Sequence, residues 1–234
     1  MPAPDLDPME LPERIGPYTL LRVIGRGGMG LVCLASKPDL VKNCALKVLA
    51  PEHSGNPQYR RRFLREGEIL AKLRHSRIVS VLGVGEADGY LFIAMDYIDG
   101  VSLRTLCQRL AAKGRRLPIT VVGYIIGEIF EALRHAHTRK IDGVLHGVIH
   151  RDVTPDNVMI SSEGEVFLSD FGIARFGADG SAEMFGKLQY MAPEQGSGVA
   201  TYRSDIWMAC GVLHYMLTGE PPRHALSWPE FQAN

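Results

Sequence analysis

The hydrophobic pattern of this chain changes once, close to residues 97–101. Before that point, short apolar runs separated by glycines are typical of β-strands, and a single segment repeats its apolar residues at helical spacing. After it, helical spacing dominates, with short strand-like runs in between. We therefore predict an α+β fold with two lobes: a small β-rich lobe with one main helix, a larger helical lobe, and a ligand cleft between them.

The same patterns predict the individual elements, with Thr120 as the N-cap of one long helix. Strands are expected over 18–24, 31–35, 44–49, 78–84 and 90–97, with short strands and loops over 146–176. Helices are expected over 57–74, 102–112, 120–138 and 204–218. The domain prediction is a disordered lead over 1–14, a first lobe over 15–97 and a second lobe over 98–234.

The composition argues against several classes of function. The 26 basic and 26 acidic side chains give a net charge of zero, so nucleic acid is not an expected partner. The first residues lack the apolar core of a signal peptide, and we predict no membrane segment within this chain. The four cysteines form no C-x-x-C pair, which favours free thiols in a reducing compartment and hence a cytoplasmic location.

Glycines cluster in one segment, Gly25-Arg26-Gly27-Gly28-Met29-Gly30. Strand-like sequence flanks the segment on both sides, which predicts a hairpin rather than the strand-to-helix turn of a dinucleotide fold. Glycines let a backbone come close to a ligand and point its N–H groups at phosphate oxygens. The alternative is a plain glycine-rich turn.

A lysine lies in the apolar strand that follows, and a buried lysine needs a counter-charge. Glu66, on the helix predicted over 57–74, is the expected partner of Lys47. Glu68 is the competing partner, but it lies two positions further on and faces elsewhere on a helix. The remaining alternative is that Lys47 extends to solvent.

The densest chemical signal runs from His150 to Asn157 and is followed by Asp170-Phe171-Gly172. A carboxylate and an amide oxygen are hard ligands that suit Mg²⁺, so Asp170 and Asn157 are the candidate metal ligands. Asp152 can accept a proton from a substrate hydroxyl.

With Met191-Ala192-Pro193-Glu194 and Leu217-Thr218-Gly219-Glu220-Pro221-Pro222, these motifs resemble the bacterial eukaryotic-like serine/threonine protein kinases over about residues 18–222. The resemblance implies the two-lobed kinase fold, with a C-lobe left incomplete because such domains usually continue with further helices. It also implies ATP and Mg²⁺ as cofactors and protein substrates as partners. A regulatory protein or a second copy of the chain is a further class of partner that the sequence leaves open.

By resemblance, each motif carries a role in this family. Lys47, held by Glu66, would orient the α- and β-phosphates, and Asp152 would be the proton acceptor. The other nucleotide-binding positions are Ile24, Gly25, Arg26, Gly27, Gly28, Met29, Gly30, Val32, Ala45, Met95, Asp96 and Ile98. Leu70, His150 and Phe171 would stack as packing residues, and Asp205 would brace the loop that carries Asp152.

The sequence departs from the family pattern at two reciprocal positions. Thr154 stands where a lysine is usual, and Lys187 stands where a threonine is usual. We therefore interpret Lys187 as the residue that reaches the transferred phosphate. Ser181 is the one hydroxyl residue between Ile173 and Gln189, so it is the local candidate for a phosphosite.

Two classes of function follow. The first is an active ATP-dependent kinase that phosphorylates Ser and Thr hydroxyls of proteins. The alternative is a nucleotide-binding pseudokinase or regulatory module that acts through protein partners. A small-molecule phosphotransferase is a weaker third reading, because the Ala192-Pro193-Glu194 segment suits protein substrates.

Overall fold

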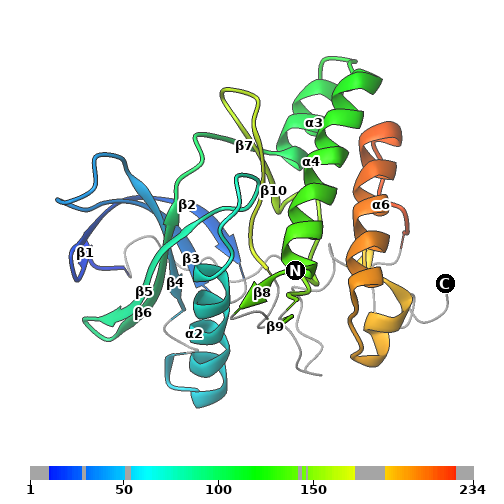
Figure 1. Cartoon of the computed structure of the whole chain (residues 1–234). Coiled ribbons are helices and arrows are strands. Elements are labelled where there is room, and N and C mark those ends of the chain that lie inside the picture. The colour runs from blue at the N-terminus through cyan, green and yellow to red at the C-terminus, as the bar shows by residue number, and fades with distance from the viewer. Residues whose placement is uncertain are drawn as a thin grey trace. The chain divides into compact units, whose positions relative to one another are not determined.

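The computed structural model describes residues 11–27, 30–50, 54–141, 144–145, 147–171 and 188–224. The chain divides into two compact units (Figure 1). Unit 1 comprises residues 1–72 and 80–97, and unit 2 comprises residues 73–79 and 98–234. Whether the predicted lobes 15–97 and 98–234 act as functional domains stays a prediction.

Unit 1 is built on a six-stranded antiparallel sheet with the strand order β1-β2-β3-β4-β6-β5. Its strands are β1 (Arg14–Ile15), β2 (Tyr18–Gly27), β3 (Gly30–Ser36), β4 (Cys44–Leu49), β5 (Val81–Ala87) and β6 (Tyr90–Asp96). The central strands β4 and β6 are almost continuously apolar, and both are buried along most of their length. Burial of these side chains is the main force that holds the sheet together.

One helix, α2 (Pro57–Ala71), packs against β5 and β6 (Figure 1). Its start is fixed locally: the Asn56 side chain accepts a hydrogen bond from the Gln58 amide, and Pro57 occupies the first turn. Gly67 faces the sheet, and a Cβ at that position would lie 2.5 Å from Val84 Cγ2. Glycine therefore permits the close approach of α2 to β5.

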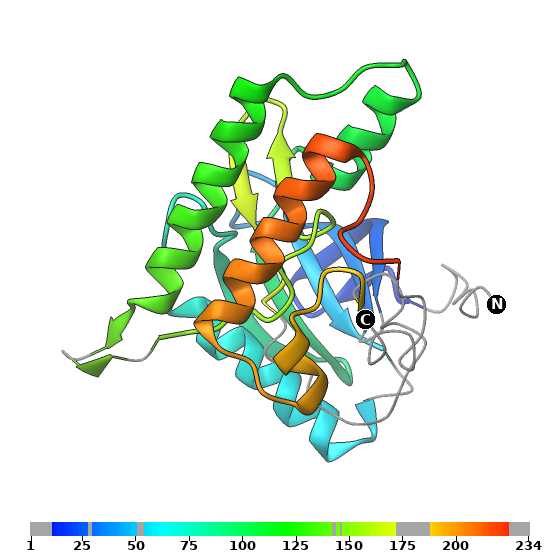
Figure 2. The same ribbon diagram turned by 90° about the vertical axis from the view of Figure 1, so that its right-hand side faces the viewer.

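Unit 2 holds the remaining elements. Its helices are α3 (Leu103–Ala111), α4 (Ile119–His137), the 3₁₀ helix η3 (Pro193–Ser197) and α6 (Tyr202–Thr218). Its strands are β7 (Gly100–Ser102), β8 (Lys140–Ile141), β9 (Val144–Leu145), β10 (Val158–Ser161) and β11 (Val166–Leu168). Helices α4 and α6 lie side by side, each with a buried apolar face (Figures 1 and 2). Strand β10 pairs with both β7 and β11 in a three-stranded sheet.

Two local predictions are wrong. Thr120 does not cap α4, because the helix already starts at Ile119 and its N-cap, Pro118, has no side-chain hydrogen bond. The strand predicted over 78–84 starts only at Val81. Ile78 and Val79 belong instead to unit 2, where the Val79 amide donates to the Leu168 carbonyl at 3.1 Å.

Across the described part of the chain, none of the helices has the length and apolar character needed to cross a membrane.

Candidate active site

The glycine-rich segment forms a hairpin, as its flanking strands predict. Pairing between β2 and β3 continues to its tip, where Gly27 faces Gly30. Gly30 is required for steric reasons, because a Cβ there would lie 1.8 Å from the Val48 carbonyl oxygen. Gly28 and Met29 lie outside the described residues.

The strand register gathers several predicted nucleotide-binding residues on one face of the sheet of unit 1. Val32 is directly opposite Lys47, and Ala45 is directly opposite Met95. Lys47 and Ala45 are two residues apart on β4 and therefore point to the same side. Gly25 pairs with Val32 and adds the hairpin to this face. Asp96 ends β6, and Ile98 begins the second stretch of unit 2, residues 98–234.

Lys47 and Glu66 form the ion pair expected from the sequence. Lys47 Nζ lies 2.8 Å from Glu66 Oε1, and the Glu66 side chain is only 3% exposed. Glu68, the competing partner, points to solvent from the opposite side of α2. A buried carboxylate left without its cation is costly, so the pair fixes the position of Lys47 on the sheet.

In unit 2, Asp152 and Asn157 are joined directly. Asn157 Nδ2 donates to Asp152 Oδ2 at 2.7 Å and to the Asp152 carbonyl at 2.8 Å. Both residues are buried. Because the amide nitrogen faces these two oxygens, the Asn157 amide oxygen points elsewhere, and it accepts no hydrogen bond from the described residues.

The β10–β11 hairpin brings Asn157 and Asp170 to the same place. Asn157 comes directly before β10, and Asp170 follows β11 after one residue. In an antiparallel pair these two ends coincide, and the Ser169 amide donates to the Asn157 carbonyl at 2.9 Å. Asp170 adopts a left-handed backbone with φ +52°.

The donor set of Asn157 and Asp170 fits a magnesium ion. Among the described residues, no group of three or more His, Cys, Asp or Glu side chains forms a metal site. Mg²⁺ in nucleotide sites needs fewer protein ligands, because phosphates and water complete its octahedron. The Asp170 carboxylate and the Asn157 amide oxygen, which accepts no hydrogen bond from the described residues, would supply enough protein ligands for that arrangement.

His150 and Asp205 fix the backbone of the loop that carries Asp152. The Asp205 carboxylate accepts hydrogen bonds from the amides of His150 and Arg151, both at 2.7 Å, and lies 2.7 Å from His137 Nε2. The bracing role expected of Asp205 is therefore present in the geometry.

His150 itself bonds on both ring nitrogens. Nε2 donates to the Ser169 carbonyl at 3.0 Å, and Nδ1 accepts from the Asp152 amide at 3.2 Å. Because Nδ1 accepts a hydrogen bond, the ring is neutral, and complete burial lowers the pKa of His150 against the opposing effect of nearby carboxylates. The Phe171 ring packs on it with a centroid distance of 4.3 Å.

Thr154 is buried, and its hydroxyl has no hydrogen-bond partner among the described residues. Its predicted counterpart, Lys187, lies outside the described residues, as do Gly172 and Ser181. Leu70 is buried in unit 1.

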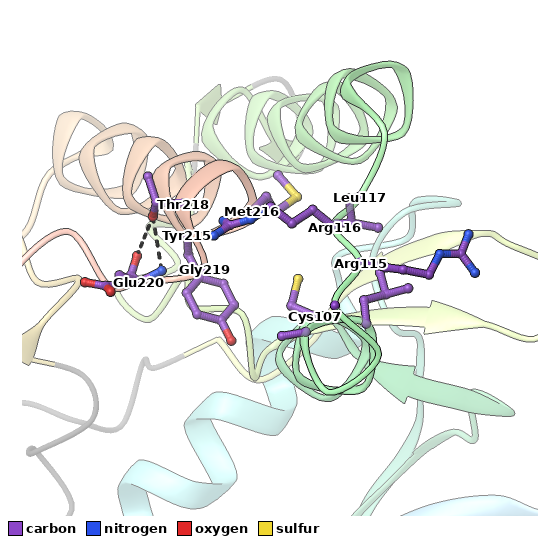
Figure 3. Close-up of a pocket in the computed structure, with 12 residues that line it drawn as sticks. Cys107, Arg115, Arg116, Leu117, Tyr215, Met216, Thr218, Gly219 and Glu220 are labelled. Atoms are coloured by element: carbon purple, nitrogen blue, oxygen red, sulfur yellow. Dashed lines mark hydrogen bonds between the residues drawn. The ribbon is translucent and has the colours of Figure 1, made fainter.

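A surface hollow of about 420 Å³ lies in another part of unit 2 (Figure 3). Side chains from α3, the loop after it and the end of α6 line it, among them Cys107, Arg116, Tyr215 and Met216. None of the predicted site residues lines this hollow.

Sequence comparison matches residues 18–230 to the protein kinase domain family. The chain belongs to this family. It is 38% identical over 218 residues to serine/threonine-protein kinase PknD of Mycobacterium tuberculosis, covering 91% of this chain and 31% of PknD. It is also 38% identical over 214 residues to PknJ of the same organism, covering 88% of this chain and 34% of PknJ. The chain thus spans about a third of the length of these curated relatives.

Solved structures agree with the assignment. A point mutant of the Mycobacterium tuberculosis PknI kinase domain superposes with a TM-score of 0.71 at 34% identity, covering 90% of this chain and 77% of that one. A second PknI kinase-domain structure gives a TM-score of 0.69 at 35% identity, covering 89% and 75%. The α+β kinase fold predicted from the sequence is therefore confirmed.

Sequence reasoning missed several contacts of the site. Arg104 pairs with Asp156 inside the Asp152 loop, and the Ser204 hydroxyl donates to Glu194 at 2.6 Å. No local sequence pattern predicts these pairs, because the two partners of each pair lie on different elements. The only sequence feature that pointed to one of these pairs was the acidic residue Asp156, directly before Asn157.

Proposed function

We propose that this chain is the catalytic domain of a serine/threonine protein kinase that transfers the γ-phosphoryl group of Mg·ATP to protein hydroxyls. The observation that carries the proposal is the direct bond between Asn157 and Asp152, with Asp170 at the same end of the β10–β11 hairpin. The two curated relatives are named as serine/threonine kinases, which supports the choice of acceptor.

The surroundings of the residues support the roles that we propose for them. In unit 1, the hairpin glycines and Lys47 would bind phosphates, with Lys47 held in place by Glu66. Val32, Ala45 and Met95 would surround the adenine. In unit 2, Asn157 and Asp170 would hold magnesium, which when bound neutralises charge on the transferred phosphoryl group.

Asp152 would orient the acceptor hydroxyl and take its proton. Its Oδ2 is held by Asn157 and its backbone amide by His150, so the carboxylate has a fixed orientation before substrate binds. Positioning and charge stabilisation supply most of the catalysis in this class of reaction.

The test is phosphate transfer from Mg·ATP by the purified chain, to itself and to a generic protein substrate. Asp152→Asn and Asp170→Ala should each abolish transfer, while Glu68→Ala, on the exposed side of α2, should leave it unchanged. Tight Mg·ATP binding without any transfer would instead support the pseudokinase alternative.

We further propose that Lys187 and Thr154 have exchanged roles. The buried Thr154 hydroxyl without a described partner supports this, because such a group needs a hydrogen bond from outside the described residues. Lys187→Met should lower kcat by about 100-fold or more, the scale of losing one charge-stabilising donor. The double variant Lys187→Thr with Thr154→Lys should regain activity. Unchanged turnover in Lys187→Met would rule the exchange out.

A further inference from the structure

We infer that Arg104 determines substrate specificity: it neutralises Asp156 beside the acceptor site, so that substrates with a neutral side chain facing Asp156 are preferred over basic ones. The inference rests on the proposed function and adds the class of protein substrate to it.

The ion pair between these residues is close and well supported. Arg104 Nε lies 2.8 Å from both carboxylate oxygens of Asp156. The Arg104 side chain is 24% exposed and that of Asp156 is 53% exposed, so the pair lies at the surface but is partly shielded. The Arg104 amide also donates to the Pro155 carbonyl at 3.0 Å, which ties the start of α3 to the Asp152 loop.

Two tyrosines hold the guanidinium in place. Its central carbon lies 5.7 Å from the ring centre of Tyr190 and 5.2 Å from that of Tyr215, distances typical of cation–π contacts. Both tyrosines are buried and pack edge to face. Contacts to three separate parts of unit 2 leave Arg104 little freedom to swing away from Asp156.

Asp156 directly precedes Asn157, the residue that bonds to the proposed proton acceptor Asp152. A hydrogen bond of 3.0 Å from the Asn157 amide to the Thr154 carbonyl closes a tight turn, whose ends are within about 7 Å of each other. Asn157 is in turn bonded to Asp152. An extended peptide advances about 3.3–3.6 Å per residue, so a side chain one to three residues from the acceptor hydroxyl is level with Asp156.

The charges around Asp156 determine whether a substrate side chain beside it is attracted or repelled. A carboxylate alone would attract Lys or Arg, but Arg104 already satisfies it. Along the chain, Arg104 begins a segment without negative charge: residues 103–127 contain no Asp or Glu. They contain five basic residues, Arg104, Arg109, Lys113, Arg115 and Arg116. A basic substrate side chain that faces Asp156 therefore gains no partner from this carboxylate and is repelled by Arg104.

The experiment compares peptides that share one serine and differ in carrying Gln, Arg or Glu at each nearby position. The readout is the ratio of kcat/KM for Arg against Gln peptides. The wild-type chain should favour Gln, and Arg104→Met should shift the ratio toward Arg by at least about tenfold. Combining Arg104→Met with Asp156→Asn should remove that gain. Arg109→Met, an exposed arginine on the same helix, is the matched control and should leave the ratio unchanged.

A folded and active Arg104→Met variant with the wild-type ratio would overturn the inference while leaving the proposed function intact. If wild type phosphorylates no peptide or protein, the proposed function itself fails and the inference fails with it. Should Arg104→Met not fold, Asp156→Asn alone decides: freeing the Arg104 charge should raise the preference for Glu peptides, and an unchanged preference would contradict the inference.

Discussion

At the scale of single residues, His150 joins the two segments of unit 2 that carry Asp152 and Asp170. One ring nitrogen bonds to the Asp152 amide and the other to the carbonyl of Ser169, the residue before Asp170. Only the neutral ring can do both, because Nδ1 must accept a hydrogen bond while Nε2 donates one. Protonation would therefore break the bond to the Asp152 loop.

This arrangement predicts loss of stability in mild acid. Burial lowers the pKa of His150 in the folded chain below its unfolded value of about 6.5. Its contribution to stability is thus complete above that value and is lost as pH falls through the folded pKa, by up to about 1.4 kcal/mol per pH unit. Urea unfolding at pH 7.5, 6.5 and 5.5 would measure the slope. His150→Phe, which keeps a ring against Phe171, should show a shallower slope; equal slopes would disprove the assignment.

At the scale of elements, the contact between α2 and β5 sets the position of Glu66. The helix directs Phe63, Glu66, Gly67 and Leu70 toward the interior of unit 1, while Glu68 points outward. Since Glu66 precedes Gly67, any displacement of the helix at the glycine also moves the carboxylate that holds Lys47. The packing of α2 on β5 is thereby coupled to the geometry of the Lys47–Glu66 ion pair.

Gly67→Ala should therefore destabilise unit 1 by about 1–3 kcal/mol, the usual cost of overpacking. The added methyl would lie 2.5 Å from Val84 Cγ2 and 3.1 Å from Ile93 Cγ1. Adding Val84→Ala makes room and should recover part of the loss in urea unfolding. Glu68→Ala, one position away on the exposed side, should change stability by less than about 0.5 kcal/mol.

At the scale of the whole molecule, the chain leaves unit 1 after α2, enters unit 2 for residues 73–79, and then returns to unit 1 at Ser80. Several contacts hold this short segment in unit 2. The Leu168 amide donates to the Arg77 carbonyl at 2.8 Å, Arg77 forms an ion pair with Glu128, and the ring of His75 stacks on His135 at 4.6 Å.

Hydrogen exchange should reveal this division. The amides of Val79 and Leu168 bond across one strand pair of unit 2, so at increasing urea they should lose protection together. The amides of β5, only a few residues further on, should follow the other strands of unit 1. The division would be contradicted if the Val79 amide lost protection at the same urea concentration as the amides of β5 and at a different one from the Leu168 amide.

The sequence alone was sufficient for the features encoded locally. The glycine hairpin and the helix carrying Glu66 follow from period and residue type, because strands and helices have different apolar spacing. The set of kinase motifs was recognised by its resemblance to the family. Asp152, Asn157 and Asp170 were identifiable as a group, since hard oxygen ligands within one short span point to a single chemistry. The roles assigned to them stay predictions.

Tertiary structure decided what depends on residues distant in sequence. That Ile78 and Val79 belong to unit 2 could not be predicted from their apolar character, because apolar residues suit a strand in either unit. The bonds of Asp205 to the Asp152 loop span more than fifty residues, and Arg104 reaches Asp156 across 52. Such pairs form only when packing brings two elements together. The free energy that stabilises this packing is distributed over many buried contacts, so no single segment of the sequence reveals the pairs.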